Sequence, residues 1–171
     1  MAKLLGAIIA GGKARRFGRD KAAEPVGGMA MIDHVIAALE PQVDALVLCG
    51  RRWRDLPVLD DTPGGTIGPL GGLNAALHYA LTHGYDGVLC APVDVLPLPA
   101  DLAAQLIGDT PAVLERQHMI GYWPATLAHA LDMHLAGEHD GSLRQWFAKT
   151  NPRRIPDPPG LRNINRPEDL E

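Results

Sequence analysis

The sequence has few cysteines, few aromatic residues and no excess of positive charge. Its two cysteines, Cys49 and Cys90, each end an apolar run, so we expect buried strand residues rather than metal ligands or a disulfide. The net charge of −4 does not indicate general nucleic-acid binding. No apolar run approaches the ~20 residues that cross a bilayer, and the first apolar run starts too early for a signal peptide. We therefore expect a cytoplasmic protein without membrane or nucleic-acid partners.

What remains is an ordinary globular composition. Hydrophobic residues make up 46% and charged residues 21% of the 171 residues. A chain of this length buries most of the surface that its unfolded form exposes. We therefore predict a single domain over residues 1–171. We also expect a monomer or weak oligomer.

Segments of helical and strand periodicity alternate along the chain. Short apolar runs predict strands, and apolar residues three and four positions apart predict helices. The expected strands cover residues 4–9, 43–49, 56–59, 87–91, 112–115 and 119–123, the last two as a hairpin. The expected helices cover 31–39, 73–81, a segment from 101, 126–135 and 142–150. This order predicts a three-layer αβα, Rossmann-like fold with a mainly parallel mixed sheet. Ligands of such sheets bind beyond the carboxyl ends of the strands, so Gly11, Gly50, Asp61 and Asp94 should face one crevice.

A glycine-rich and basic loop follows the first predicted strand. Gly11 and Gly12 allow backbone N–H groups to approach an anion closely. The cations nearby are Arg15, Arg16, Arg19 and Lys21. The spacing fits neither a P-loop nor a dinucleotide-binding fingerprint. The pattern predicts a nucleoside triphosphate site, and the alternative is a glycine turn with a solvated basic face.

The segment from Ile8 to Lys21 resembles the signature of the molybdenum cofactor guanylyltransferases, a family of nucleotidyltransferases with a GT-A-like fold. Three later features match that family in the same order. They are Asp61 with the glycine-rich segment from Gly68 to Gly72, Asp94 after the fourth strand, and the paired Asn163 and Asn165 near the C-terminus. The alternative for Asp94 alone is a residue that caps a turn.

The resemblance implies transfer of GMP from GTP to molybdopterin with release of pyrophosphate. It implies catalytic roles for Arg16, Lys21 and Asp94, with Mg²⁺ as the cofactor on Asp94, a carboxylate of the kind that magnesium prefers. Lys13, Arg15 and Arg19 are expected to form a solvated face. The residues that the resemblance assigns to nucleotide binding are Ile9, Ala10, Gly11, Gly12, Lys21, Asp61, Gly68, Pro69, Leu70, Gly71, Asn163 and Asn165.

The chain departs from the family pattern in three places. Cys49-Gly50 replaces an asparagine that contacts the nucleotide, Val95-Leu96 replaces Thr-Pro, and the acceptor-side segment His-Pro-Thr reads His118-Met119-Ile120. Three alternatives therefore stay open. One is a nucleotidyltransferase for a sugar or polyol phosphate, another is a molybdopterin enzyme that uses CTP, and the third is a non-catalytic partner that binds nucleotide or cofactor.

Overall fold

A seven-stranded mixed sheet forms the centre of the computed structural model, which describes residues 2–11, 20–66, 68–165 and 169. The sheet has the strand order β10-β8-β9-β6-β1-β4-β5. Its strands are β1 (Leu4–Ile9), β4 (Ala45–Cys49), β5 (Val58–Leu59), β6 (Gly87–Pro92), β8 (Ala112–Leu114), β9 (Gly121–Pro124) and β10 (Arg153–Ile155). Strand β1 pairs in parallel with β4 and β6, whereas β9 is antiparallel to β6 and β8. The predicted mainly parallel mixed sheet and the hairpin are confirmed.

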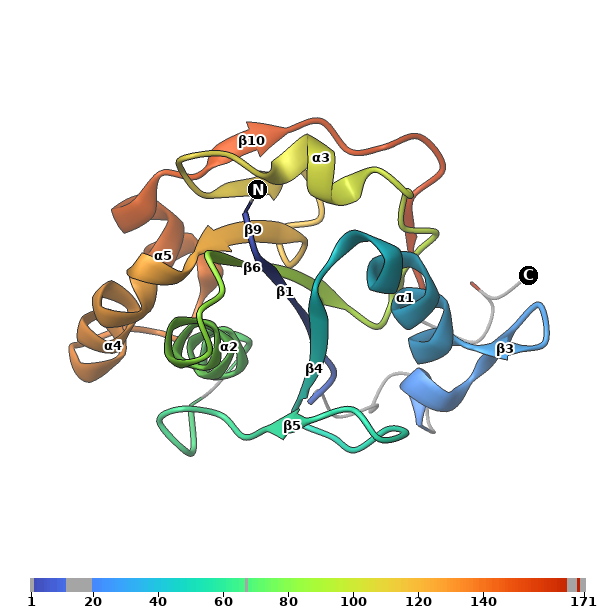
Figure 1. Ribbon diagram of the computed structural model, residues 1–171, viewed down its shortest axis with the longest axis horizontal. Helices are drawn as coiled ribbons and strands as arrows, with labels where there is room; N and C mark the ends of the chain where they lie inside the picture. The colour runs from blue at the N-terminus through green and yellow to red at the C-terminus, as the bar shows by residue number, and fades with distance from the viewer. Residues whose placement is uncertain (1, 12–19, 67, 166–168, 170–171) are drawn as a thin grey trace.

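Helices cover both faces of this sheet (Figure 1). One face packs against α1 (Met31–Leu39) and α3 (Leu102–Leu106), and the other against α2 (Leu70–Thr82), α4 (Ala128–Ala136) and α5 (Leu143–Thr150). Strand β1 is buried on both sides, because Leu4 and Ile8 enter one core while Leu5 and Ala7 enter the other. This alternation of side chains along one strand produces the predicted three-layer architecture.

Short elements that the sequence periodicity did not predict lie at one edge of the sheet and around it. They are the hairpin of β2 (Pro25–Val26) and β3 (Met29–Ala30), the antiparallel pair of β7 (Val95–Leu96) and β11 (Arg162–Asn163), edge strand β10, and the 3-10 helices η1 (Lys21–Ala23), η2 (Glu40–Gln42) and η3 (Ala125–Leu127). Two- and three-residue strands are too short to show a period, so only their pairing identifies them.

The start of α2 differs from the prediction. The glycine-rich segment was expected to remain a loop until residue 73, but the helix begins at Leu70 and includes Gly71 and Gly72. A Cβ atom on Gly71 would lie 2.8 Å from the Cγ atom of Asp61, and one on Gly72 would lie 3.2 Å from the Cβ atom of Cys49. The two glycines therefore allow the end of the sheet to pack closely on the first helical turn, which outweighs their low helix propensity.

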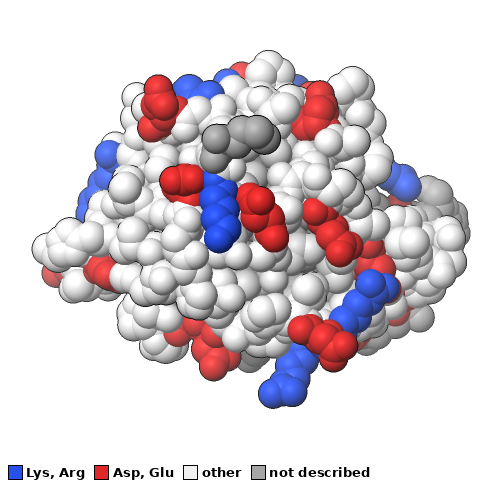
Figure 2. All heavy atoms as spheres, viewed as in Figure 1, with Lys and Arg blue, Asp and Glu red and all other residues white. Residues whose placement is uncertain are grey.

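The face of the molecule shown in Figure 2 carries acidic and basic side chains that are interspersed. In the described ranges, no helix has the length and apolar character needed to cross a membrane.

Candidate functional site

A cavity of about 370 Å³ opens at the carboxyl ends of the central parallel strands. Segments that follow β1, β4, β5 and β6 contribute to its walls. The lining residues are Ile9, Ala10, Gly11, Asp20, Lys21, Ala22, Cys49, Arg51, Asp61, Gly68, Pro69, Gly72, Pro92, Val93, Asp94 and Met119. The sequence predicted this location, because a ligand crevice in such a sheet lies where the strands end.

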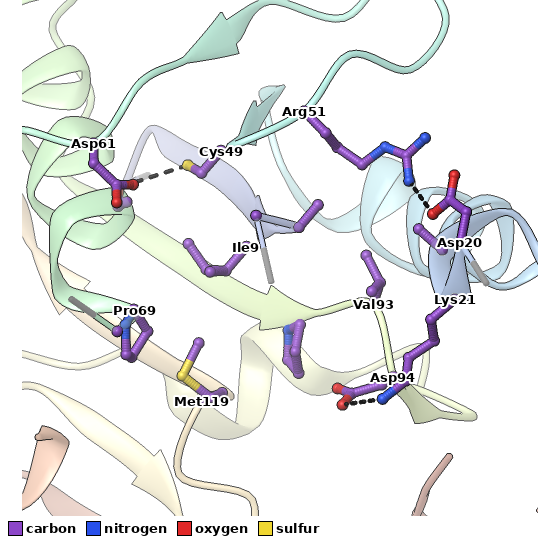
Figure 3. A pocket seen from close by; sticks show the side chains of 16 residues that line it. Ile9, Asp20, Lys21, Cys49, Arg51, Asp61, Pro69, Val93, Asp94 and Met119 are labelled. Atoms are coloured by element: carbon purple, nitrogen blue, oxygen red, sulfur yellow. Dashed lines mark hydrogen bonds and ion pairs between the residues drawn. The ribbon is translucent and has the colours of Figure 1, made fainter. Parts of the chain in front are cut away.

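An ion pair occupies one end of the cavity. Lys21 Nζ lies 3.3 Å from Asp94 Oδ2, and the two side chains are 19% and 25% exposed. Figure 3 shows this pair on the opposite side of the cavity from Asp61 and Pro69, with Ile9 between them. Lys21 begins η1, just after the glycine-rich loop, and Asp94 follows β6. The fold thus places a cation and a carboxylate together, 73 positions apart in the chain.

A second ion pair lies beside the first. Arg51 Nη1 donates a hydrogen bond to Asp20 Oδ1 at 2.5 Å, and its guanidinium carbon lies 5.2 Å from the ring centre of Trp53. The hydrogen bond from Arg51 lowers the pKa of the Asp20 carboxyl. Adjacent residues Asp20 and Lys21 therefore bond in different directions, one to the loop after β4 and the other to the loop after β6.

The opposite end of the cavity is formed by Asp61, Gly68 and Pro69. Partial burial raises the pKa of the Asp61 carboxyl, and the neighbouring Asp60 raises it further. Cys49 lies at the floor of the cavity, where its Sγ donates to the carbonyl of Gly72 at 3.5 Å. Burial raises the pKa of the Cys49 thiol to about 12, so this thiol is protonated at neutral pH. Both cysteines are buried and free, as predicted.

The predicted nucleotide-binding residues that the structure describes fall into three groups, which are residues that line the cavity, residues behind its wall and residues of the C-terminal segment. Those that line the cavity are Ile9, Ala10, Gly11, Lys21, Asp61, Gly68 and Pro69. Leu70 and Gly71 lie behind this wall, Leu70 within the core and Gly71 against Asp61. Gly12 and Arg16 lie outside the described residues, as do Lys13, Arg15 and Arg19.

Asn163 and Asn165 belong to a segment that returns to the site without lining the cavity. Strand β11 pairs with β7, and the N–H group of Ile164 donates to the carbonyl of Asp94 at 2.6 Å. Asn163 and Asn165 are exposed on either side of this contact. The C-terminal segment thus supports the backbone of Asp94.

Sequence reasoning assigned no nucleotide-binding or catalytic role to several residues of the cavity wall, above all Asp20, Arg51 and Met119. Arg51 directly follows Gly50 at the end of β4, a position from which side chains reach the ligand crevice of a parallel sheet. That position was the available signal. Met119 was assigned to a strand, but β9 begins two residues later at Gly121.

One carboxylate in the cavity is suited to hold a magnesium ion. Mg²⁺ requires only one or two protein carboxylates when phosphate oxygens and water complete its shell, and Asp94 supplies a carboxylate within the cavity. The described part of the chain contains no cluster of three or more His, Cys, Asp or Glu side chains that could hold a metal alone.

The sequence pattern of the MobA-like NTP transferase domain matches residues 6–154. The chain belongs to this family. It is 37% identical to a molybdenum cofactor guanylyltransferase of Cereibacter sphaeroides over 185 residues, which cover 98% of this chain and 94% of that protein. It is 34% identical to a protein of the same name from Rhodobacter capsulatus, with 98% and 93% covered. The family resemblance of the glycine-rich loop is thereby confirmed.

Solved structures confirm the fold. The molybdopterin-guanine dinucleotide biosynthesis protein A of Archaeoglobus fulgidus superposes with a TM-score of 0.74 at 19% identity, covering 97% of this chain and 94% of that one. An inositol-1-phosphate CTP transferase from T. maritima superposes with a TM-score of 0.72 at 11% identity, with 100% and 93% covered. Proteins named for different nucleotides and acceptors therefore share this fold, so the fold alone does not identify the substrates.

Proposed function

We propose that this protein is a molybdenum cofactor guanylyltransferase, which transfers GMP from GTP to molybdopterin and releases pyrophosphate. One observation carries the proposal: the cavity has an ion pair of Lys21 and Asp94 at one end and a glycine-lined wall beside Asp61 at the other. A nucleoside triphosphate needs such a division, with charged groups for its phosphates and close backbone packing for its base and ribose. The choice of GTP and molybdopterin rests on the names of the relatives that are 34% and 37% identical.

In the proposed reaction, a phosphate oxygen of molybdopterin attacks the α-phosphorus of GTP. A new P–O bond forms, and the bond from the α-phosphorus to the oxygen that bridges to the β-phosphate breaks, so pyrophosphate leaves with that electron pair. The attacking phosphate is already ionised near neutral pH, so the reaction needs no separate general base. The protein has to reduce charge repulsion and hold the oxygens in line.

The residues of the cavity fit those tasks. Gly11 brings backbone close to the phosphates, and Lys21 supplies a positive charge beside them. Asp94 would hold the magnesium ion, which supplies Lewis-acid neutralisation of the phosphate charge when bound. Asp61 and Gly68 would contact the base and ribose. Gly12 and Arg16 keep their proposed phosphate-binding roles from the family resemblance.

A matrix of two nucleotides and two acceptors tests the proposal. Purified protein with Mg²⁺ would receive GTP or CTP together with molybdopterin or a sugar phosphate, and pyrophosphate release would be followed. We expect release with GTP and molybdopterin only. Release with CTP would correct the nucleotide, and release with a sugar phosphate would correct the acceptor. Nucleotide binding without release in any combination would favour a non-catalytic partner.

A further inference from the structure

Asn74 is a buried polar residue on a helix whose neighbouring positions are apolar. It lies on α2 at 0% exposure, between Leu73 and Ala75 in the sequence. A buried amide is costly unless it forms hydrogen bonds. The Nδ2 group of Asn74 donates to the carbonyl of Thr62 at 2.9 Å and to Oδ1 of Asp132 at 2.8 Å. Asn74 therefore joins α2 to two other parts of the chain.

The first of these bonds holds the segment that carries Asp61. The N–H group of Thr62 donates to the carbonyl of Gly71 at 3.1 Å, and its carbonyl accepts from Asn74. Both polar groups of the Thr62 backbone are thus bound to α2. Asp61 precedes Thr62 and packs against Gly71 at the cavity wall. The position of the Asp61 carboxylate therefore depends on the two hydrogen bonds between Thr62 and α2.

The second bond reaches the surface of the molecule. Asp132 lies on α4, which packs beside α2 (Figure 1). Its carboxylate also accepts from Nε2 of His78 at 2.8 Å, one turn after Asn74 on α2. The Asp132 side chain is 41% exposed, so a substitution there disturbs no core packing. Asp132, near the surface, therefore orients the buried Asn74 amide by accepting its hydrogen bond.

We propose that Asn74, oriented by Asp132, is a positioning residue that fixes Asp61 at the base end of the nucleotide cavity and so sets the affinity for GTP. This inference rests on the proposed function. Asn74 does not line the cavity, so it acts through Asp61 and not on the substrate. The Lys21–Asp94 pair lies at the opposite end (Figure 3) and should be unaffected. A role limited to joining α2 and α4 would instead affect stability alone.

The test separates effects on binding at the base end of the cavity from effects at the phosphate end. Asn74→Leu removes both hydrogen bonds, Asp132→Ala removes the outer acceptor, and Asp132→Asn retains an acceptor oxygen. Glu138→Ala, an exposed acidic position just after α4, is the charge-matched control. For each variant we would measure Tm, the Kd for GTP, KM and kcat. We would also measure the inhibition constant of inorganic tripolyphosphate, which has no base or ribose.

We expect Asn74→Leu to raise the Kd and KM for GTP about threefold to tenfold, the effect of losing a buried hydrogen bond. Asp132→Ala should show a smaller rise that Asp132→Asn restores. Tripolyphosphate inhibition and kcat should stay at the wild-type level. Unchanged GTP affinity in both Asn74→Leu and Asp132→Ala, or an equal loss of GTP and tripolyphosphate affinity, would overturn the inference.

Asp132→Ala decides the question if Asn74→Leu does not fold, because its site is exposed. Wild-type protein that binds GTP but transfers nothing would overturn the proposed function alone, since the Kd values still test Asn74. Wild-type protein that does not bind GTP would overturn both.

Discussion

Replacing Asp94 with asparagine separates a catalytic role of this residue from a structural one. The substitution keeps the size of the side chain and removes its charge. It leaves the backbone carbonyl, which accepts a hydrogen bond from Ile164 at 2.6 Å, in place. Among the described residues, the substitution directly weakens the ion pair of Asp94 with Lys21 at 3.3 Å.

The two expected effects differ greatly in size. With side chains that are 19% and 25% exposed, the ion pair should stabilise the fold by about 1 kcal/mol or less. A change of that size lowers Tm by roughly 2–4 °C in a protein of this length. Loss of the carboxylate that would hold magnesium weakens the electrostatic stabilisation of the reacting phosphates, which costs about 100- to 1,000-fold in kcat. If Asp94 is catalytic, Asp94→Asn should therefore lose a large part of kcat with little loss of thermal stability.

The assay combines thermal unfolding with steady-state guanylyl transfer at saturating GTP and molybdopterin. Arg54→Gln is the control, because it removes a surface ion pair with Asp33 at 2.9 Å away from the cavity. This control should keep wild-type kcat. Nearly full activity of Asp94→Asn would refute the catalytic role of Asp94. A loss of activity that is explained by a large fall in Tm would instead indicate a structural role.

Three further predictions concern the cavity wall. Gly71→Ala would force a Cβ atom to within 2.8 Å of Asp61, so we expect KM for GTP to rise roughly tenfold or more; an unchanged KM would mean that Asp61 can move without consequence. Arg51→Ala removes the ion pair that holds the residue next to Lys21. It should raise KM for GTP measurably but by no more than about fivefold, since the pair is partly exposed, and an unchanged KM in steady-state kinetics would contradict this. Burial raises the pKa of the Cys49 and Cys90 thiols to about 12, so both stay protonated below that pH. Ellman's reagent at pH ~8 should find almost no reactive thiol until denaturant is added, and rapid labelling of the native protein would contradict this.

The sequence was sufficient to predict six of the seven strands of the central sheet and the location of the cavity. The apolar run Leu4–Ile9 and the helical spacing of Met31–Leu39 each coincide with an observed element. Lys21, Asp61 and Asp94 line one cavity because parallel strands bring their carboxyl ends together. Local sequence patterns, together with the rule that ligands bind at the carboxyl ends of parallel strands, were enough to predict these features.

Long-range contacts account for what the sequence did not reveal. Nothing near Arg51 in the chain indicates its bond to Asp20, 31 positions away. The first turn of α2 was assigned to a loop because glycine disfavours helices, and only the packing of Asp61 explains why Gly71 is helical. Asn74 gave no signal, because its two acceptors become its neighbours only in the folded chain.

Transfer of a labelled α-phosphate is the decisive test of whether this protein moves GMP to molybdopterin. Wild-type protein would be incubated with Mg²⁺, molybdopterin and GTP that carries a radiolabel on the α-phosphate, and the products would be separated. If the protein transfers GMP to molybdopterin, the label will appear in a pterin dinucleotide, in an amount equal to the pyrophosphate released. Label that stays in GTP, or that appears only in free GMP, would contradict it.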